Sequence, residues 1–230
     1  MHEVILNNIS FELDVAHLMK ELHINDGGRY AEDLKRLAYA VQAIAKPKAL
    51  YKVAFIEFKG DDTVVVGGTK LTSRVLRVNL EQADRVFPYV ATCGTELDDW
   101  SRSVEDMLHR YWADTMKEMA LRSAIRALNE DLAERYLPGC TSTMSPGSLE
   151  NWPLEEQRGL FAILGNTKDA IGVQLSDSLL MIPTKSVSGI RFPTEESFES
   201  CRLCPRVKCP GRRCPYDEQL YERKYRPRTN

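Results

Sequence analysis

The sequence predicts an α+β domain built on a mainly antiparallel sheet. Two helical patterns come first, strand periodicity takes over near residue 49, and helices and strands then interleave without a regular βα alternation. With 230 residues, 43% apolar and 28% charged, the chain can form one substantial domain with a small appendage. We therefore expect a folded protein and not a disordered one.

Two amphipathic helices are predicted before residue 47. In residues 14–24, apolar side chains recur at helical spacing, and Gly27-Gly28 ends the pattern. A second helix follows and ends before Pro47. Its apolar stripe consists of Leu34, Leu37, Ala38, Val41 and Ile44.

The middle of the chain is predicted to alternate between strands and one long helical region. The expected strands are residues 49–58 (ALYKVAFIEF), 63–68 (TVVVGG), 73–80 (SRVLRVNL) and 86–94 (VFPYVATCG). Residues 96–136 read as helix, and because about 40 residues exceed a usual helix, we expect a break inside them. Leu137-Pro138-Gly139 should end this region.

The remainder is expected to hold one helix and three short strands. Pro153 stands where a first helical residue would, with acidic residues following in the first turn. The strand candidates are residues 171–175 (IGVQL), 179–183 (LLMIP) and 186–192 (SVSGIRF). No metalloprotease, Walker A or Gly-rich dinucleotide motif occurs, and the four histidines are scattered singly, so side-chain catalysis is not expected.

Four cysteines near the C-terminus carry the strongest chemical signal. Cys201, Cys204, Cys209 and Cys214 have the spacing C-x2-C-x4-C-x4-C. Disulfides between residues so near in sequence would close small, strained loops. Thiolates suit an iron–sulfur cluster or zinc, so we expect a metal centre.

The start of the chain shows no basic segment followed by an apolar one, and no run is apolar enough to span a membrane. We therefore expect a cytoplasmic protein. In a reducing compartment, clustered thiols are more often metal ligands than disulfides. Free cysteines are commonly buried as small apolar residues, which is the default expectation for Cys93 and Cys140, although either could complete the metal site if Cys214 is not a ligand.

The C-terminal tail, residues 201–230, is basic, with nine Lys/Arg against three Asp/Glu, while the rest of the chain is acidic. This asymmetry favours an anionic partner or contact with the chain's own acidic body. Zinc knuckles that bind single-stranded nucleic acid have similar spacing, but no aromatic residue lies between these cysteines for a base to stack on. A structural zinc tail on an adaptor is a further alternative.

Two segments, SPGSLENWPLEEQRGLFAILG and IGVQLSDSLLMIPTKSVSGIRF, resemble the reactivation domain of cobalamin-dependent methionine synthase. The matching parts are the Pro146-Gly147 loop, the helix at 154–164, the strand region at 172–178 and the S-V-S-G strand at 186–189. The resemblance covers roughly residues 86–193. Stand-alone relatives of this domain often have a similar cysteine-rich C-terminus.

This resemblance implies a curved antiparallel sheet flanked by helices and a cofactor site that includes Ser145, Pro146, Gly147 and Ser188. In the family, the domain binds S-adenosylmethionine, docks on a corrinoid-carrying domain and supports reductive methylation of cobalt. The family loop reads R-x-x-x-G-Y, whereas here Thr143 and Ser148 replace the arginine and the tyrosine. The loss of arginine removes a bidentate partner for a carboxylate.

The sequence therefore predicts two parts: a reactivation-like domain over residues 1–200 and a metal-binding tail over 201–230. The expected role is an accessory protein in the reductive activation of a corrinoid methyltransferase or methionine synthase. Cobalamin would sit on the partner, and a [4Fe–4S] cluster in the tail would supply the electron, with zinc as the alternative metal.

Overall fold

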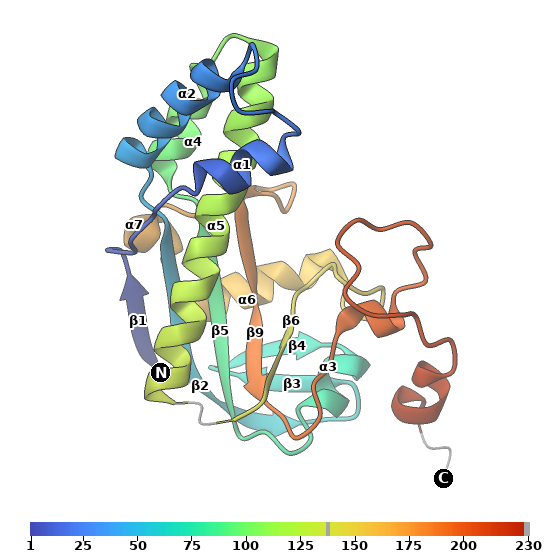
Figure 1. Ribbon diagram of the computed structural model, residues 1–230. Helices are drawn as coiled ribbons and strands as arrows, with labels where there is room; N and C mark the ends of the chain where they lie inside the picture. The colour runs from blue at the N-terminus through green and yellow to red at the C-terminus, as the bar shows by residue number, and fades with distance from the viewer. Residues whose placement is uncertain (137–138, 228–230) are drawn as a thin grey trace.

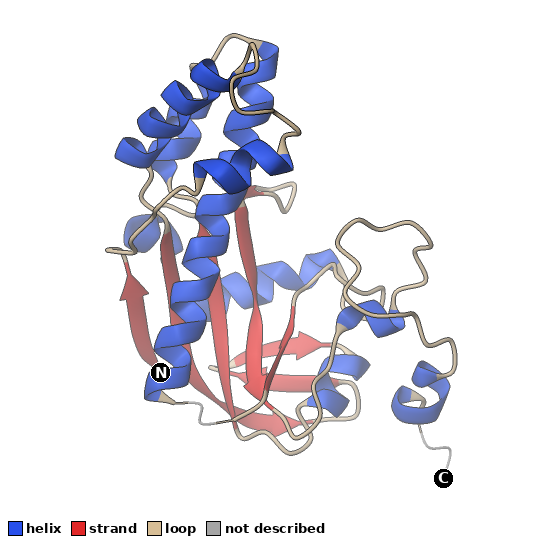
Figure 2. Ribbon diagram, in the orientation of Figure 1, coloured by secondary structure: helices blue, strands red, loops and turns tan. Residues whose placement is uncertain are grey.

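The computed structural model describes residues 1–136 and 139–227, and it shows a sheet with helices on both faces (Figures 1 and 2). The strands of the main sheet are β1 (His2–Leu6), β2 (Lys48–Lys59), β3 (Thr63–Val66), β4 (Thr69–Thr72), β5 (Arg85–Thr92), β6 (Thr141–Met144) and β9 (Ser186–Pro193). A separate short hairpin consists of β7 (Gln174–Leu175) and β8 (Met181–Ile182).

The helices flank this sheet. They are α1 (Val15–Glu21), α2 (Ala31–Ile44), α3 (Arg74–Asn79), α4 (Thr95–Arg102), α5 (Met107–Arg135), α6 (Gln157–Leu164) and α7 (Thr167–Ile171), with short turns η1 (Leu154–Glu156), η2 (Ser200–Leu203) and η3 (Tyr221–Tyr225). In Figure 1, α5 runs along the front of the sheet and α6 lies behind it.

The strand order is β4-β3-β2-β5-β9-β6, with β1 pairing along β2, and every strand pair in the described residues is antiparallel. The twelve-residue strand β2 pairs with β1 and β5, and its C-terminal end pairs with β3 across a register shift between Ile56 and Phe58. Figure 1 shows β3 and β4 crossing the lower end of the sheet. This confirms the predicted mainly antiparallel α+β fold.

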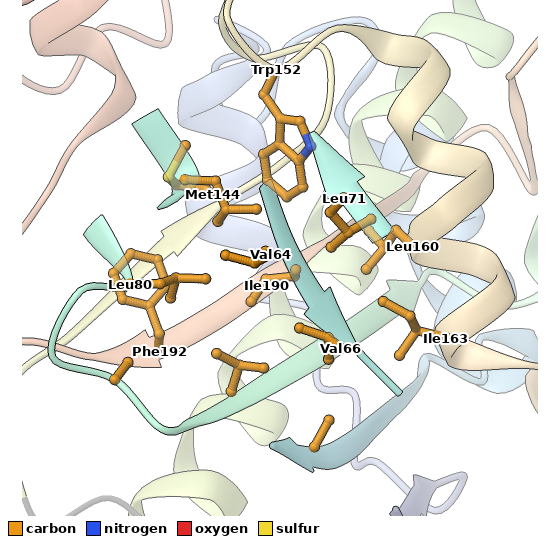
Figure 3. Packing of buried hydrophobic residues seen from close by; sticks show 14 of the residues in the cluster. Val64, Val66, Leu71, Leu80, Met144, Trp152, Leu160, Ile163, Ile190 and Phe192 are labelled. Carbon is orange, nitrogen blue, oxygen red and sulfur yellow. The ribbon is translucent and has the colours of Figure 1, made fainter. Parts of the chain in front are cut away.

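The two faces of the sheet bury two separate cores, because successive strand side chains point to opposite faces. On β5, Phe87, Tyr89 and Ala91 join the core beneath α1, α2, α4 and α5. Val86 and Val90 belong to the second core, on the side of α3, α6 and α7. Figure 3 shows part of this second core, with Trp152, Leu160, Ile190 and Phe192 among its members.

The strand predicted at residues 73–80 is wrong, because this segment forms α3. Ser73 is the N-cap, and its Oγ accepts a hydrogen bond from the backbone N–H of Leu76 at 3.1 Å. Val75, Leu76 and Leu80 are buried at a spacing that suits a helix facing the second core. The cap and the burial override the strand propensity of the valines.

The predicted break in the long helical region is confirmed: α4 ends at Arg102 and α5 begins at Met107. Asp106 caps α5 by accepting a hydrogen bond from the N–H of His109 at 2.8 Å. The predicted stop at Leu137-Pro138 lies outside the described residues. Among the described helices, none is long and apolar enough to cross a membrane.

Candidate functional site: a pocket and a cysteine loop joined by one turn

The loop after β6 forms a tight turn over Ser145, Pro146, Gly147 and Ser148. The backbone N–H of Ser148 and its Oγ both donate to the carbonyl oxygen of Ser145, at 3.2 and 2.6 Å. Gly147 has φ +79°, and a Cβ there would lie 2.9 Å from Leu154 Cδ1. The turn therefore requires glycine at position 147.

This turn forms one wall of a pocket of about 300 Å³. Three of the four cofactor residues expected from the sequence, Ser145, Pro146 and Ser188, line it, and Gly147 belongs to the same turn. The other lining residues are Leu154, Gln157, Leu179, Leu180, Met181, Thr184 and Val187. The structure thus brings the sequence-predicted loop and strand together at one cavity.

The pocket is largely apolar, with a polar pair at its base. Gln157 and Ser188 are each only 3% exposed, and Gln157 Nε2 donates to Ser188 Oγ at 3.4 Å. None of the side chains lining the pocket carries a formal charge. The pocket therefore suits an apolar or aromatic group that presents a neutral hydrogen-bonding edge.

Gly189 explains why the turn can approach the sheet so closely. A Cβ at Gly189 would lie 2.5 Å from the carbonyl oxygen of Met144 and 2.8 Å from Ser145 Oγ. Only glycine leaves room for β6 and its following turn at this point of β9. The S-V-S-G stretch thus supplies both a pocket hydroxyl, from Ser188, and this close approach.

The two positions that depart from the family loop have different surroundings. Ser148 is exposed and bonded within its own turn, whereas Thr143 Oγ1 is buried without a hydrogen-bond partner among the described residues. Thr143 pairs across the sheet with Arg191 of β9, whose Nη1 donates to Thr141 Oγ1 at 2.8 Å. Burial lowers the pKa of Arg191. An arginine therefore does lie beside position 143, but on the neighbouring strand.

The C-terminal tail docks on the second core through its last turn. Leu220 and Tyr225 are buried there, and the Tyr225 hydroxyl donates to Asn79 Oδ1 at 2.8 Å. Arg74 Nε of α3 donates to the Tyr225 carbonyl oxygen at 2.9 Å. The four tail cysteines lie before this anchor, in the loop at the right of Figure 1, and each is partly exposed.

The four tail thiols are free in the structure. Across residues 1–136 and 139–227, no three Cys, His, Asp or Glu side chains are grouped so that they could hold a metal ion. The metal centre that the spacing predicts therefore stays a prediction, and so does the domain boundary at residue 200. Cys204 packs against the second core, which joins the start of the loop to the body.

A second cavity, of about 450 Å³, lies between the cysteine loop and the body. The body contributes Leu149, Glu150 and Asn151, which directly follow the turn of the first pocket. The tail contributes Leu203 and Tyr221 among others. One segment, residues 145–151, therefore lines the candidate cofactor pocket with one end and supports the cysteine loop with the other.

Asn151 holds this shared segment in place. Its Oδ1 accepts hydrogen bonds from the Val75 N–H at 2.8 Å and from Ser73 Oγ at 3.2 Å, at the start of α3. Its Nδ2 donates to the Tyr221 hydroxyl at 3.5 Å. Neither Asn151 nor Gln157 stands out in the sequence, because a lone amide in a turn or helix is usually a surface residue.

The two remaining cysteines differ from each other. Cys93 is fully buried in the first core, as expected, and burial raises the pKa of its thiol to about 12. Cys140 is exposed, so its expected burial is wrong. It precedes β6, the strand at the edge of the sheet, and its carbonyl oxygen accepts from the Thr194 N–H at 3.1 Å.

The search of solved structures finds a fold match that covers most of the chain. A crystal structure of the MetH reactivation domain bound to AdoHcy superposes with a TM-score of 0.59 and 15% sequence identity. The match covers 86% of this chain and 80% of that one. The protein therefore has the fold of the methionine synthase reactivation domain, as the resemblance implied. No protein-family model and no curated protein matches the sequence.

Proposed function

We propose that this chain is an accessory protein for the reductive activation of a corrinoid-dependent methyltransferase or methionine synthase. The observation that carries the proposal is the segment 145–151, which joins an uncharged cofactor-sized pocket to a loop with four cysteines. The fold likeness to a methionine synthase reactivation domain supports the same role.

The pocket is proposed to hold the adenosyl part of a ligand such as S-adenosylmethionine or its product. Its apolar walls suit a nucleoside ring, and Gln157 and Ser188 supply neutral hydrogen-bonding groups at its base. The carboxylate of such a ligand would need a cation from outside the pocket, since Thr143 stands where the family loop has arginine.

The cysteine loop is proposed to hold a [4Fe–4S] cluster through Cys201, Cys204, Cys209 and Cys214. For this, the four thiols must turn toward one another from their positions in the structure. Held there, the cluster would supply one-electron reduction of the cobalt of a corrinoid partner, with a separate low-potential donor as the source of the electron and a sulfonium compound as the source of the methyl group.

The partner is expected to dock near the cysteine loop. Arg206 and Lys208 are exposed at its tip, Val207 between them is 90% exposed, and the tail is basic as a whole. An acidic surface on the corrinoid protein would complement this charge, and the association rate would then fall with added salt.

Two measurements test the proposal. Anaerobically prepared protein should contain about four irons and four sulfides per chain, and the Cys201→Ser/Cys204→Ser double variant should contain none. The protein, an external electron donor and S-adenosylmethionine should convert a cobalamin-binding module loaded with cob(II)alamin into its methylated form, followed by absorbance.

Zinc without iron would contradict the redox role and support a structural tail. Salt-sensitive binding of a single-stranded oligonucleotide, without any effect on the corrinoid module, would instead indicate a zinc knuckle. Calorimetric titration with S-adenosylhomocysteine checks the pocket separately, with Gly147→Ala as the variant expected to lose binding. No heat with the parent protein would reject the ligand assignment.

A further inference from the structure

Arg212 lies at the centre of the cysteine loop and contacts the backbone of all four cysteines. Its Nη1 donates to the carbonyl oxygens of Cys201 at 3.2 Å and Cys214 at 3.4 Å. Its Nη2 donates to the carbonyl oxygen of Cys204 at 3.1 Å and to that of Arg206. Its backbone N–H donates to the carbonyl oxygen of Cys209 at 3.1 Å.

This pattern matters because the loop has no regular secondary structure of its own. Residues 204–219 form no helix or strand, so their carbonyl groups lack the partners that a ladder would supply. A guanidinium is planar and offers five N–H donors in a fixed fork. Here it binds carbonyl groups that lie up to thirteen positions apart in the chain. The Arg212 side chain thus supplies hydrogen bonds that regular secondary structure would otherwise provide.

The neighbouring basic residues do not share this role. Arg213 points outward, with its side chain 75% exposed and paired with Glu199 at 3.4 Å. Arg206 and Lys208 are exposed at the loop tip. Arg212 is the partly buried member of this group, and its bonds go inward to the backbone. Arg213 is therefore a matched control for charge and sequence position.

We infer that Arg212 is the positioning residue that keeps the four-cysteine loop folded in the metal-free chain, so that a metal centre enters a preformed loop. The first half of this inference, that Arg212 keeps the loop folded, stands on its own. The second half, that a metal centre enters the preformed loop, rests on the proposed metal centre. The tail would then differ from a zinc finger, whose fold depends on its metal. Lysine cannot replace Arg212, because one ammonium group cannot reach carbonyls on both sides of the loop.

Hydrogen–deuterium exchange on the full chain, stripped of metal, tests the first half. Amides in residues 201–217 should exchange at least about tenfold faster in Arg212→Ala than in the parent protein, because local opening becomes easier. Arg212→Lys should resemble Arg212→Ala, and Arg213→Ala should resemble the parent. Peptides from β5 and β9 should exchange equally in all variants, which shows that the body remains folded.

Equal exchange of residues 201–217 in the parent and Arg212→Ala would overturn the inference. So would exchange in the metal-free parent as fast as in a denatured chain. Cobalt(II) titration, followed by thiolate-to-cobalt absorption, tests the second half: Arg212→Ala should bind at least about tenfold more weakly than Arg213→Ala. If the parent binds neither cobalt nor iron, the proposed metal centre is wrong, and the exchange data alone still decide the role of Arg212.

Discussion

The body of this protein and its tail are each stabilised by a different kind of interaction. The body buries two apolar cores, one on each face of a continuous antiparallel sheet. The tail has a short apolar anchor around Leu220 and Tyr225, and its cysteine loop depends on hydrogen bonds from Arg212. Apolar burial contributes more free energy than exposed polar contacts, so the body should set the global stability and the tail should open locally.

The contrast indicates where such a fold can hold a reactive group. Thiols that must exchange a metal or an electron need access, and a loop held by polar bonds gives access without disturbing a core. The body instead supplies a rigid floor, since residues 149–151 support the loop.

Thiol reactivity should separate the two regions most sharply. The pKa of Cys93, about 12 against an ordinary 9.0, leaves roughly a thousandfold fewer thiolates at neutral pH, and its side chain is fully buried. In metal-free native protein, a chromogenic disulfide reagent should therefore react quickly with Cys140 and the tail thiols, among which Cys214 should be slowest because burial raises its pKa. It should react with Cys93 only after unfolding. Rapid reaction of all six thiols in the native protein would contradict the expected difference between body and tail. So would slow reaction of the tail thiols in the absence of metal.

A cavity in the body should destabilise the whole molecule. Phe192 is fully buried in the second core, and Phe192→Ala should lower the free energy of unfolding by about 3–5 kcal/mol. Urea denaturation measures this change. Tyr39→Ala, at a side chain 72% exposed on α2, serves as the control and should change it by less than about 0.5 kcal/mol. If Phe192→Ala lowers the free energy of unfolding no more than Tyr39→Ala does, the second core does not stabilise the fold.

Alkaline pH should weaken both regions. Burial raises the pKa of Cys93, Tyr51 and Tyr89 in the body. The Cys93 thiol ionises near pH 9 when unfolded and near 12 when folded, so the unfolded state binds fewer protons in between. Stability is then complete below pH 9 and falls by about 1.4 kcal/mol per pH unit as pH rises toward 12. Burial also raises the pKa of Tyr225 to about 12 from 10.0, which adds a loss above pH 10.

Denaturation measured from pH 8 to 11 checks these windows. Cys93→Ala should remove most of the loss that begins at pH 9. Tyr225→Phe should reduce the part that begins at pH 10, to which Tyr51 and Tyr89 also contribute because burial raises their pKa values. A pH profile unchanged by either substitution would mean that other groups cause the alkaline loss.

The smallest effect is expected at the anchor of the tail. Tyr225→Phe keeps the buried ring but removes the hydroxyl that donates to Asn79 Oδ1, which should cost about 1 kcal/mol. Amide exchange in residues 217–226 should accelerate accordingly, while the exchange of β5 should not change. Equal acceleration in both segments would show that the tail and the body unfold as one unit.

Much of the fold could be predicted from the hydrophobic periodicity and from the residues that end helices and strands. The break before Met107 follows from helix length, and the strand at 86–94 follows from its apolar run. The strand prediction for residues 73–80 is wrong because the valines of this segment favour a strand locally. The Ser73 cap and burial against the second core stabilise a helix instead. The edge strand β6 was missed because its four residues, three of them polar, give no strand pattern.

The candidate site could be predicted only in part, because several of its residues act through tertiary contacts. Ser145, Pro146, Gly147 and Ser188 were expected from a resemblance, and the pocket brings three of them to its walls. Gln157 and Asn151 act through tertiary contacts that no local spacing encodes. Arg212 was visible only as one of several arginines, since its role comes from carbonyls that the loop brings together.

The shared segment 145–151 leads directly into Trp152, whose indole lies fully buried in the second core. Its indole N–H finds no acceptor within the described part of the chain, so the ring's emission should respond to small shifts in the polar groups around it. Binding at the pocket or at the cysteine loop should therefore change the fluorescence of Trp152. The change should be absent from a Trp152→Phe variant, in which Trp100 and Trp112 still emit.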